Sequence, residues 1–227
     1  MSVRCTLSSL TLLLASPAMA DAQTDPAGLE VYRQQDADLI ARGAAAHRIV
    51  FMGDSITQGW DRDHQTLFSD PAHINRGISG QTLAQMRLRF GQDVIALHPE
   101  TLVLLGGTND FAGNGGPVSD QAVRADIRAM VEQARASGIR VILASILPTD
   151  HYHWAPEIRP AARIVAHNRW LRDYAAREGL ELVDFYTPMA TGQGAMRPGL
   201  SGDGVHPNAA GYAVMERVLS PVIGTRR

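Results

Sequence analysis

Residues 49–57 read IVFMGDSIT, an apolar run followed directly by a glycine, an acid and a hydroxyl. A continuous apolar run of this length, ended by a turn residue, is typical of a parallel strand buried on both faces. Ser55 then falls at a sharp turn that opens a helix, where free backbone N–H groups favour an anion. The stretch therefore predicts a strand with Ser55 at its carboxyl end, either as a nucleophile or as an ordinary helix cap.

The same alternation of strand and helix continues along the chain. Apolar runs follow at residues 73–78, 102–105, 141–147 and 182–185, and helical stretches are expected near 30–42, 82–97, 119–137, 161–178 and 207–219. Strands that alternate with helices form a parallel sheet covered on both faces. We therefore predict an α/β fold, a three-layer α/β/α sandwich with five parallel strands in the order 2-1-3-4-5.

The first twenty residues have the three parts of a secretory signal. Arg4 precedes an apolar stretch over residues 7–15, which is too short to span a bilayer, and residues 18–20 read AMA, a cleavage site. Cleavage there leaves residues 21–227 as one domain. We expect an exported protein, periplasmic or secreted, without stable insertion in a membrane.

The composition excludes several kinds of chemistry. All 21 basic residues are arginine, which rules out a Schiff-base lysine and a Walker-type phosphate loop. Cys5 is the only cysteine and leaves with the signal, so the mature chain forms no disulfide. The net charge of −2 and the interspersed arginines predict no basic face for nucleic acid. We expect a small, weakly charged substrate, and the oligomeric state stays open.

Two further strand ends carry groups that can donate hydrogen bonds. The second predicted strand ends in residues 75–80, NRGISG, where Gly80 lets the backbone approach a ligand and present an N–H group. The third ends in residues 106–110, GGTND, where the Asn109 carboxamide can donate to a developing oxyanion. Each has an ordinary alternative, a Gly-rich strand exit or an asparagine that stabilises its own turn.

An acid and a histidine follow the fifth predicted strand. Residues 203–207 read DGVHP, and Gly204 permits the tight turn that brings the Asp203 carboxylate to Nδ1 of His206. Such a contact leaves Nε2 free to take a proton from a serine, and Pro207 suits the first position of the next helix. Alone, this motif is more often a surface turn. Together, the four motifs at the strand ends supply the nucleophile, oxyanion donors, base and acid of acyl transfer.

The four blocks resemble those of the SGNH (GDSL-type) hydrolases, whose named residues match Ser55, Gly80, Asn109 and His206. The resemblance implies a flavodoxin-like fold, no metal or other cofactor, and ester hydrolysis through an acyl-enzyme. It assigns the oxyanion hole to the N–H groups of Ser55 and Gly80 and the Asn109 amide. The first block reads GDSI instead of GDSL. The layout is similar to small lysophospholipase-like and platelet-activating-factor-acetylhydrolase-like bacterial members.

Two tryptophans are candidate substrate-binding residues. Trp154 follows the fourth predicted strand within residues 150–156, DHYHWAP, and Trp60 follows the nucleophile. A ring there can stack on a sugar or flank a short acyl group, and a packed surface loop is the alternative for Trp154. No long amphipathic lid is evident, which favours short acyl chains.

We therefore predict a serine esterase acting on acetyl or other short-chain esters, small molecules or glycans. The alternatives are a lysophospholipase or thioesterase for longer chains, an acyltransferase with the same triad, and a non-catalytic carbohydrate-binding module.

Overall fold

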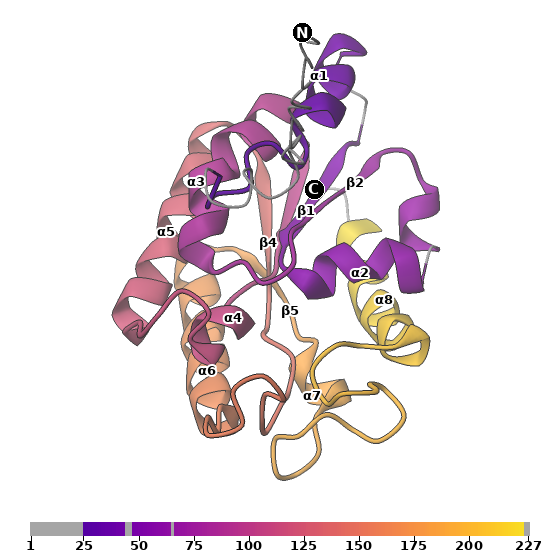
Figure 1. The fold of residues 1–227 in the computed structure, drawn as a ribbon. Coiled ribbons are helices and arrows are strands. Elements are labelled where there is room, and N and C mark those ends of the chain that lie inside the picture. Colours follow the sequence, from indigo (N-terminus) through magenta and orange to yellow (C-terminus); the bar gives the residue numbers. More distant parts are fainter. Residues whose placement is uncertain (1–24, 44–46, 65, 225–227) are drawn as a thin grey trace, which may run out of the picture.

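The computed structural model describes residues 25–43, 47–64 and 66–224 of the chain. Its centre is a parallel sheet in the order β2-β1-β3-β4-β5 (Figure 1). The strands are β1 (Ile49–Gly53), β2 (His73–Gly77), β3 (Thr101–Leu104), β4 (Arg140–Ala144) and β5 (Glu181–Val183). The predicted fold class and strand order are thus confirmed. The predicted signal over residues 1–20 lies outside the described residues.

Helices cover both faces of the sheet (Figure 1). One layer contains α3 (Leu83–Asp93), α5 (Asp120–Ala136) and α6 (Ala161–Glu178), and the other contains α2 (Ser55–Asp63) and α8 (Ala209–Gly224). Helix α1 (Arg33–Ala41) contacts α3. The short elements are η3 (Leu67–Ser69), η4 (Ile95–Leu97), α4 (Thr108–Ala112) and α7 (Tyr186–Met189).

Alternate residues of β1 pack into opposite layers. Val50 and Met52 belong to the core shared with α3, α5 and α6, whereas Ile49 and Phe51 belong to the core shared with α2 and α8. None of the four is more than 7% exposed. The strand reads as a continuous apolar run because both of its faces are buried. Helix α5 presents an apolar stripe to the first of these cores, since Val123, Ile127, Met130, Val131 and Ala134 are all buried.

One predicted helix boundary is wrong. The last helix begins at Ala209 rather than at Pro207. The side chain of Asn208 accepts from the N–H groups of Ala210 and Gly211, at 3.0 and 3.1 Å, and so caps the helix. Pro207 forms an isolated antiparallel bridge with Ser201 instead, which closes the turn between them.

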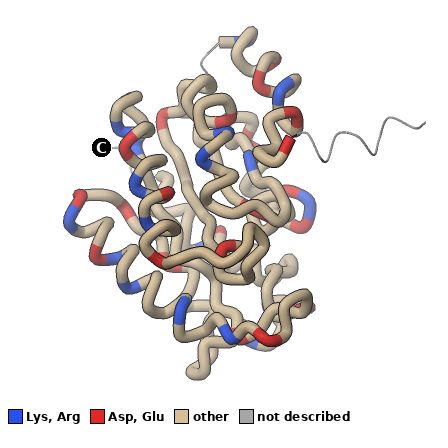
Figure 2. Tube along the Cα trace, turned by 60° about the vertical axis from the view of Figure 1, so that its left-hand side comes forward, with Lys and Arg blue, Asp and Glu red and all other residues tan. Residues whose placement is uncertain are grey.

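The surface carries charges of both signs, interspersed along the helices in the view of Figure 2. Within the described ranges, no helix is long and apolar enough to cross a membrane. Those ranges also hold no group of three or more His, Cys, Asp or Glu side chains that could bind a metal ion.

A buried cation joins the carboxyl ends of β1 and β2. Arg89 on α3 is fully buried, and its Nη2 donates to the carbonyl oxygens of Gly53 at 3.1 Å and Arg76 at 2.9 Å. Its Nε donates to Gln81 Oε1 at 2.6 Å, and Nη1 pairs with Asp93 Oδ2 at 2.7 Å. One guanidinium group therefore fixes two strand ends and the turn that follows β2.

Helix α2 passes so close to the end of β2 that only glycine fits there. A Cβ atom at Gly77 would lie 2.1 Å from the backbone N of Gln58. Helix α2, which begins at Ser55, and the end of β2 are held together by this contact.

We expect Gly77→Ala to lower the free energy of unfolding by about 1–3 kcal/mol, because the methyl group must displace the backbone of α2. Gly91→Ala on α3 is the matched control, since nothing lies within 4 Å of its Cβ position. Alanine should stabilise that helix by about 0.5–1 kcal/mol. Urea denaturation measures both changes, and equal stability of the two variants would contradict the packing of α2 on β2.

Candidate active site

Three side chains form a line of hydrogen bonds beyond the carboxyl ends of the strands. Ser55 Oγ lies 2.9 Å from His206 Nε2, and His206 Nδ1 lies 2.7 Å from Asp203 Oδ2. Ser55 begins α2 directly after β1, whereas the other two residues lie between β5 and α8. Because the carboxylate accepts the Nδ1 hydrogen, Nε2 faces the serine hydroxyl as an acceptor. This arrangement can move a proton from a serine to an imidazole.

The carboxylate of Asp203 is held by its own turn. Its Oδ1 accepts from the N–H groups of Val205 at 2.9 Å and His206 at 2.8 Å, and from the Ser201 hydroxyl at 3.0 Å. Gly204 has a φ of +80°, which glycine adopts without strain. Partial burial raises the pKa of Asp203, but the hydrogen bonds from His206 and the backbone outweigh it and hold that pKa well below its ordinary value. The acid therefore stays charged.

Helix α2 is capped by Asp54 and not by Ser55. Asp54 Oδ1 accepts from the N–H of Ile56 at 3.0 Å, so the reading of Ser55 as the helix cap does not hold. The Ser55 residue is partly exposed. Asp54 is 1% exposed, and its burial raises the pKa of the carboxyl to about 6. A buried acid and an accessible hydroxyl thus stand side by side at this turn.

Two of the three expected oxyanion donors follow β2 and β3, the strands on either side of β1. Gly80 follows β2 with a φ of +78°, and its N–H, like that of Ser55, bonds to no other described residue. Asn109 lies in α4, just after β3, and is 3% exposed. Its Nδ2 donates to the carbonyl of Gln81 at 3.0 Å and to Asp54 Oδ2 at 3.3 Å. The amide of Asn109 is therefore turned toward the nucleophile turn, although both of its hydrogens have acceptors in this state.

Trp154 and His153 form an aromatic wall beside the histidine. The Trp154 ring lies 6.0 Å from the His206 ring, centroid to centroid, and the residue is 38% exposed. His153 packs edge-on against Trp154 at 4.6 Å. Trp154 Nε1 donates to Asn114 Oδ1 at 3.1 Å, which fixes the ring by its polar edge. The structure thus places the half-exposed ring of Trp154 next to His206.

Comparison with known proteins gives the family. A family model described as the GDSL-like Lipase/Acylhydrolase family matches residues 51–214. The chain belongs to this family. It is accordingly an acylhydrolase of the SGNH superfamily that cleaves carboxylic esters, not a non-catalytic binding module.

Three relatives illustrate the range of the family. A GDSL-like lipase from Bacteroides thetaiotaomicron has a TM-score of 0.83 and is 38% identical, with 87% of this chain and 98% of that chain covered. The uncharacterized lipoprotein YqeF of Bacillus subtilis is 37% identical over 123 residues. That match spans 47% of this chain and about half, 51%, of the length of YqeF. An acetylxylan esterase from Geobacillus stearothermophilus is 26% identical over 161 residues, 66% of this chain and 71% of that protein.

The expectation that Trp60 contacts substrate is wrong, because its side chain lies in the core. Trp60 is 1% exposed and stacks on Tyr212 of α8 with 5.6 Å between ring centroids. Phe51 of β1 and Phe185 meet it edge-on at 6.3 and 6.0 Å. The ring joins α2 to the sheet and to α8, and has no face open to a ligand.

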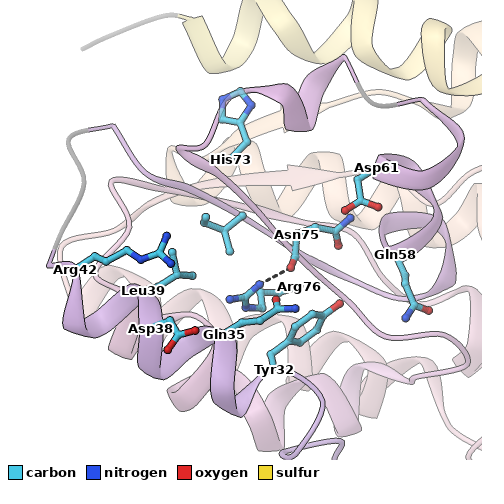
Figure 3. A pocket seen from close by; sticks show the side chains of 11 residues that line it. Tyr32, Gln35, Asp38, Leu39, Arg42, Gln58, Asp61, His73, Asn75 and Arg76 are labelled. Carbon is cyan, nitrogen blue, oxygen red and sulfur yellow. Dashed lines mark hydrogen bonds between the residues drawn. The ribbon is translucent and has the colours of Figure 1, made fainter.

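A cavity of about 400 Å³ in the acylhydrolase lies between α1, α2 and β2, apart from the triad (Figure 3). Its lining includes Gln35 and Asp38 of α1, Gln58 of α2, and Asn75 and Arg76 of β2. Arg76 Nη1 donates to the Asn75 carbonyl at 2.6 Å, the bond dashed in Figure 3. None of the lining residues is Ser55, Asp203 or His206, so this cavity is separate from the hydrogen-bonded line formed by those three side chains.

Two polar residues of the site were not expected from the sequence. Asp54 precedes Ser55 in the GDS block, and an acid at a helix start is commonly a cap, so its position gives no signal of a buried carboxyl beside the serine. Asn114 donates from Nδ2 to Asn109 Oδ1 at 2.7 Å. An asparagine followed by glycine is typical of a turn, and no local pattern reveals such a contact.

The two tryptophans should respond oppositely to removal. We expect Trp60→Ala to lower the free energy of unfolding by about 3–5 kcal/mol, because it leaves a cavity between α2, β1 and α8. Trp154→Ala, at a partly exposed loop position, should cost about 1 kcal/mol or less. Denaturant unfolding of both variants provides the comparison. A Trp60→Ala protein as stable as the Trp154→Ala protein would be incompatible with a buried Trp60.

Proposed function

We propose that this acylhydrolase is a serine esterase with Ser55 as nucleophile, His206 as general base and Asp203 as the orienting acid. The observation that carries the proposal is the unbroken line of two hydrogen bonds, 2.9 and 2.7 Å long, that joins the three side chains. A serine hydroxyl is a weak nucleophile until an adjacent base takes its proton. In this chain the base and its orienting acid both meet the distance that proton transfer requires.

The reaction follows the triad mechanism. As Ser55 Oγ bonds to the ester carbon, its proton passes to His206 Nε2 and the carbonyl electrons move to the oxygen. Collapse of this intermediate breaks the bond to the leaving alcohol, which takes the proton from the imidazolium. Water then attacks the acyl-enzyme by the same route, giving the carboxylic acid and free Ser55.

The oxyanion hole is assigned to the N–H groups of Ser55 and Gly80 and the amide of Asn109. The first two make no bond to another described residue in this state and so are open to a ligand oxygen. The Asn109 amide donates to the same oxygen once its longer hydrogen bond, 3.3 Å to Asp54 Oδ2, is replaced by one to the ligand. Such donors act on charge that develops in the transition state.

The substrate class we propose is short-chain O-acyl esters, acetyl esters on carbohydrate foremost. Two observations support it: the similarity to an acetylxylan esterase and the half-open ring of Trp154 beside His206, which can stack on a sugar. The similarity to a GDSL-like lipase favours a second candidate, hydrolysis of longer acyl chains by a lysophospholipase or thioesterase.

We also propose that the protein is exported to the periplasm or the medium. Residues 1–20 have the pattern of a secretory signal, and a relative matched over about half its length is described as a lipoprotein. An acyl glycan met outside the cytoplasm is consistent with this location.

We expect a fluorophosphonate probe to label wild-type protein at Ser55 and Ser55→Ala to have lost both labelling and ester hydrolysis. The reason is that removing the nucleophile of a triad removes nearly all turnover, on the order of a millionfold in kcat. Mass spectrometry of the labelled peptide identifies the serine. Ser79→Ala is the matched control, because Ser79 is exposed and its backbone N–H, not its hydroxyl, makes the bond to Gln58. Wild-type hydrolysis by Ser55→Ala would refute the assignment.

Acyl-chain preference separates the two candidate substrate classes. We expect kcat/KM to be highest on p-nitrophenyl acetate and to fall by at least about tenfold on octanoate and further on palmitate, because a site that takes short acyl groups gains no binding energy from added methylenes. On acetylated xylo-oligosaccharide, Trp154→Ala should raise KM more than it does on p-nitrophenyl acetate. Highest activity on the long chains would favour the lipase-like alternative.

A further inference from the structure

Asn114 contacts three parts of the site at once. Its Oδ1 accepts from Trp154 Nε1 at 3.1 Å, and its Nδ2 donates to Asn109 Oδ1 at 2.7 Å. The same Nδ2 lies 3.4 Å from the carbonyl of Gly80. These contacts form what we call the amide relay: Trp154, Asn114 and Asn109. These contacts connect the aromatic wall to two of the three strand ends that are assigned oxyanion donors, those of β2 and β3.

The direction of every bond in the relay is fixed by its two ends. An indole N–H can only donate, so Asn114 must turn its oxygen toward Trp154 and its NH2 group toward Asn109. Asn109 then presents its oxygen to Asn114 and its own NH2 group to the nucleophile turn. An amide flipped by 180° at Asn109 would set its NH2 group against the NH2 group of Asn114 and its oxygen against the carbonyl oxygen of Gln81. The amide relay therefore selects the orientation in which Asn109 is a donor.

Resting on the function proposed above, we propose that Asn114 is a positioning residue that holds the Asn109 amide as an oxyanion donor and links it to the aromatic wall. Asn114 itself is exposed, so its bonds compete with water and contribute little to global stability. Asn109, by contrast, is 3% exposed. Substitution at 114 is thus expected to change turnover while leaving the fold intact.

The chain around Asn114 supports such a role. Its backbone N–H donates to the carbonyl of Asn109 at 3.0 Å, which closes the end of α4. Gly113 adopts a φ of +78° and turns the chain so that the next side chain points back. The side chain of 114 is thereby presented to the amide five residues earlier by local backbone structure.

The decisive variant is Asn114→Asp, which keeps the shape and the acceptor for Trp154 but removes the donor to Asn109. We expect kcat on p-nitrophenyl acetate to fall on the order of tenfold to a hundredfold, less than the loss of an oxyanion donor itself. KM should stay within about twofold of wild type, because an interaction made only in the transition state leaves substrate binding unchanged. Trp154→Phe, which keeps a ring and loses the N–H, should lower kcat several-fold.

Gln121→Glu is the matched control for the change from amide to carboxylate. Gln121 is exposed on α5, and its substitution should leave kcat unchanged. Thermal unfolding of each variant checks the fold, and Asn114→Ala is measured beside Asn114→Asp so that a folding defect in one does not decide the outcome.

A double mutant distinguishes positioning from a general structural effect. If Asn114 acts through Asn109, the variant carrying both Asn109→Ala and Asn114→Asp should match Asn109→Ala within about twofold in kcat. Additive losses would overturn the inference, as would wild-type kcat in Asn114→Asp and Asn114→Ala. Those results would leave the proposed triad standing, provided that Ser55→Ala is inactive. An active Ser55→Ala protein would remove the proposed function as well.

Discussion

The buried guanidinium of Arg89 is the interaction on which the placement of the site depends. A buried charge costs several kcal/mol unless it is fully paired, so its partners must stay in position around it. Those partners are the Asp93 carboxylate, the last carbonyl of β1, a carbonyl of β2 and the Gln81 side chain, at distances of 2.6 to 3.1 Å. Ser55 and Gly80 lie within two residues and four residues of the carbonyls bonded there. The core therefore fixes the nucleophile and the turn after β2 relative to each other.

The remaining residues of the site are positioned in two different ways. Strand β1 lies between β2 and β3, so the parallel topology brings Ser55, Gly80 and Asn109 to one edge of the sheet without any long loop. Asp203 and His206 arrive on a segment beyond β5, and no strand pairing holds them. They are held by the turn itself, in which the Asp203 carboxylate accepts four hydrogen bonds from Ser201, Val205 and His206. His206 is thus positioned by local structure and Ser55 by the sheet.

The sequence predicted the strands, their order and the positions of these residues, because buried strands read as apolar runs and strand ends share one edge. The prediction that Trp60 binds substrate was wrong. Ile56 stands four residues before Trp60, and this spacing puts both side chains on the same, buried face of α2. Pro207 was predicted to begin the last helix because proline favours the first helical position. The helix begins at Ala209 instead, because the side chain of Asn208 caps it. No local sequence pattern predicts the contacts of Asn114, because they join segments that follow β2, β3 and β4 and that meet only in the folded chain.

The resting hydrogen bonds of Asn109 explain how a buried amide can remain ready to donate. An amide without partners at 3% exposure would pay the full desolvation cost of its polar atoms. Here the carbonyl of Gln81 and the relay satisfy it on two sides, and the 3.3 Å contact with Asp54 is the longest of its bonds. In the proposed mechanism an oxyanion replaces only that contact. The contacts with Gln81 and Asn114 remain and hold the amide in place when charge develops, which is the condition under which fixed dipoles stabilise a transition state.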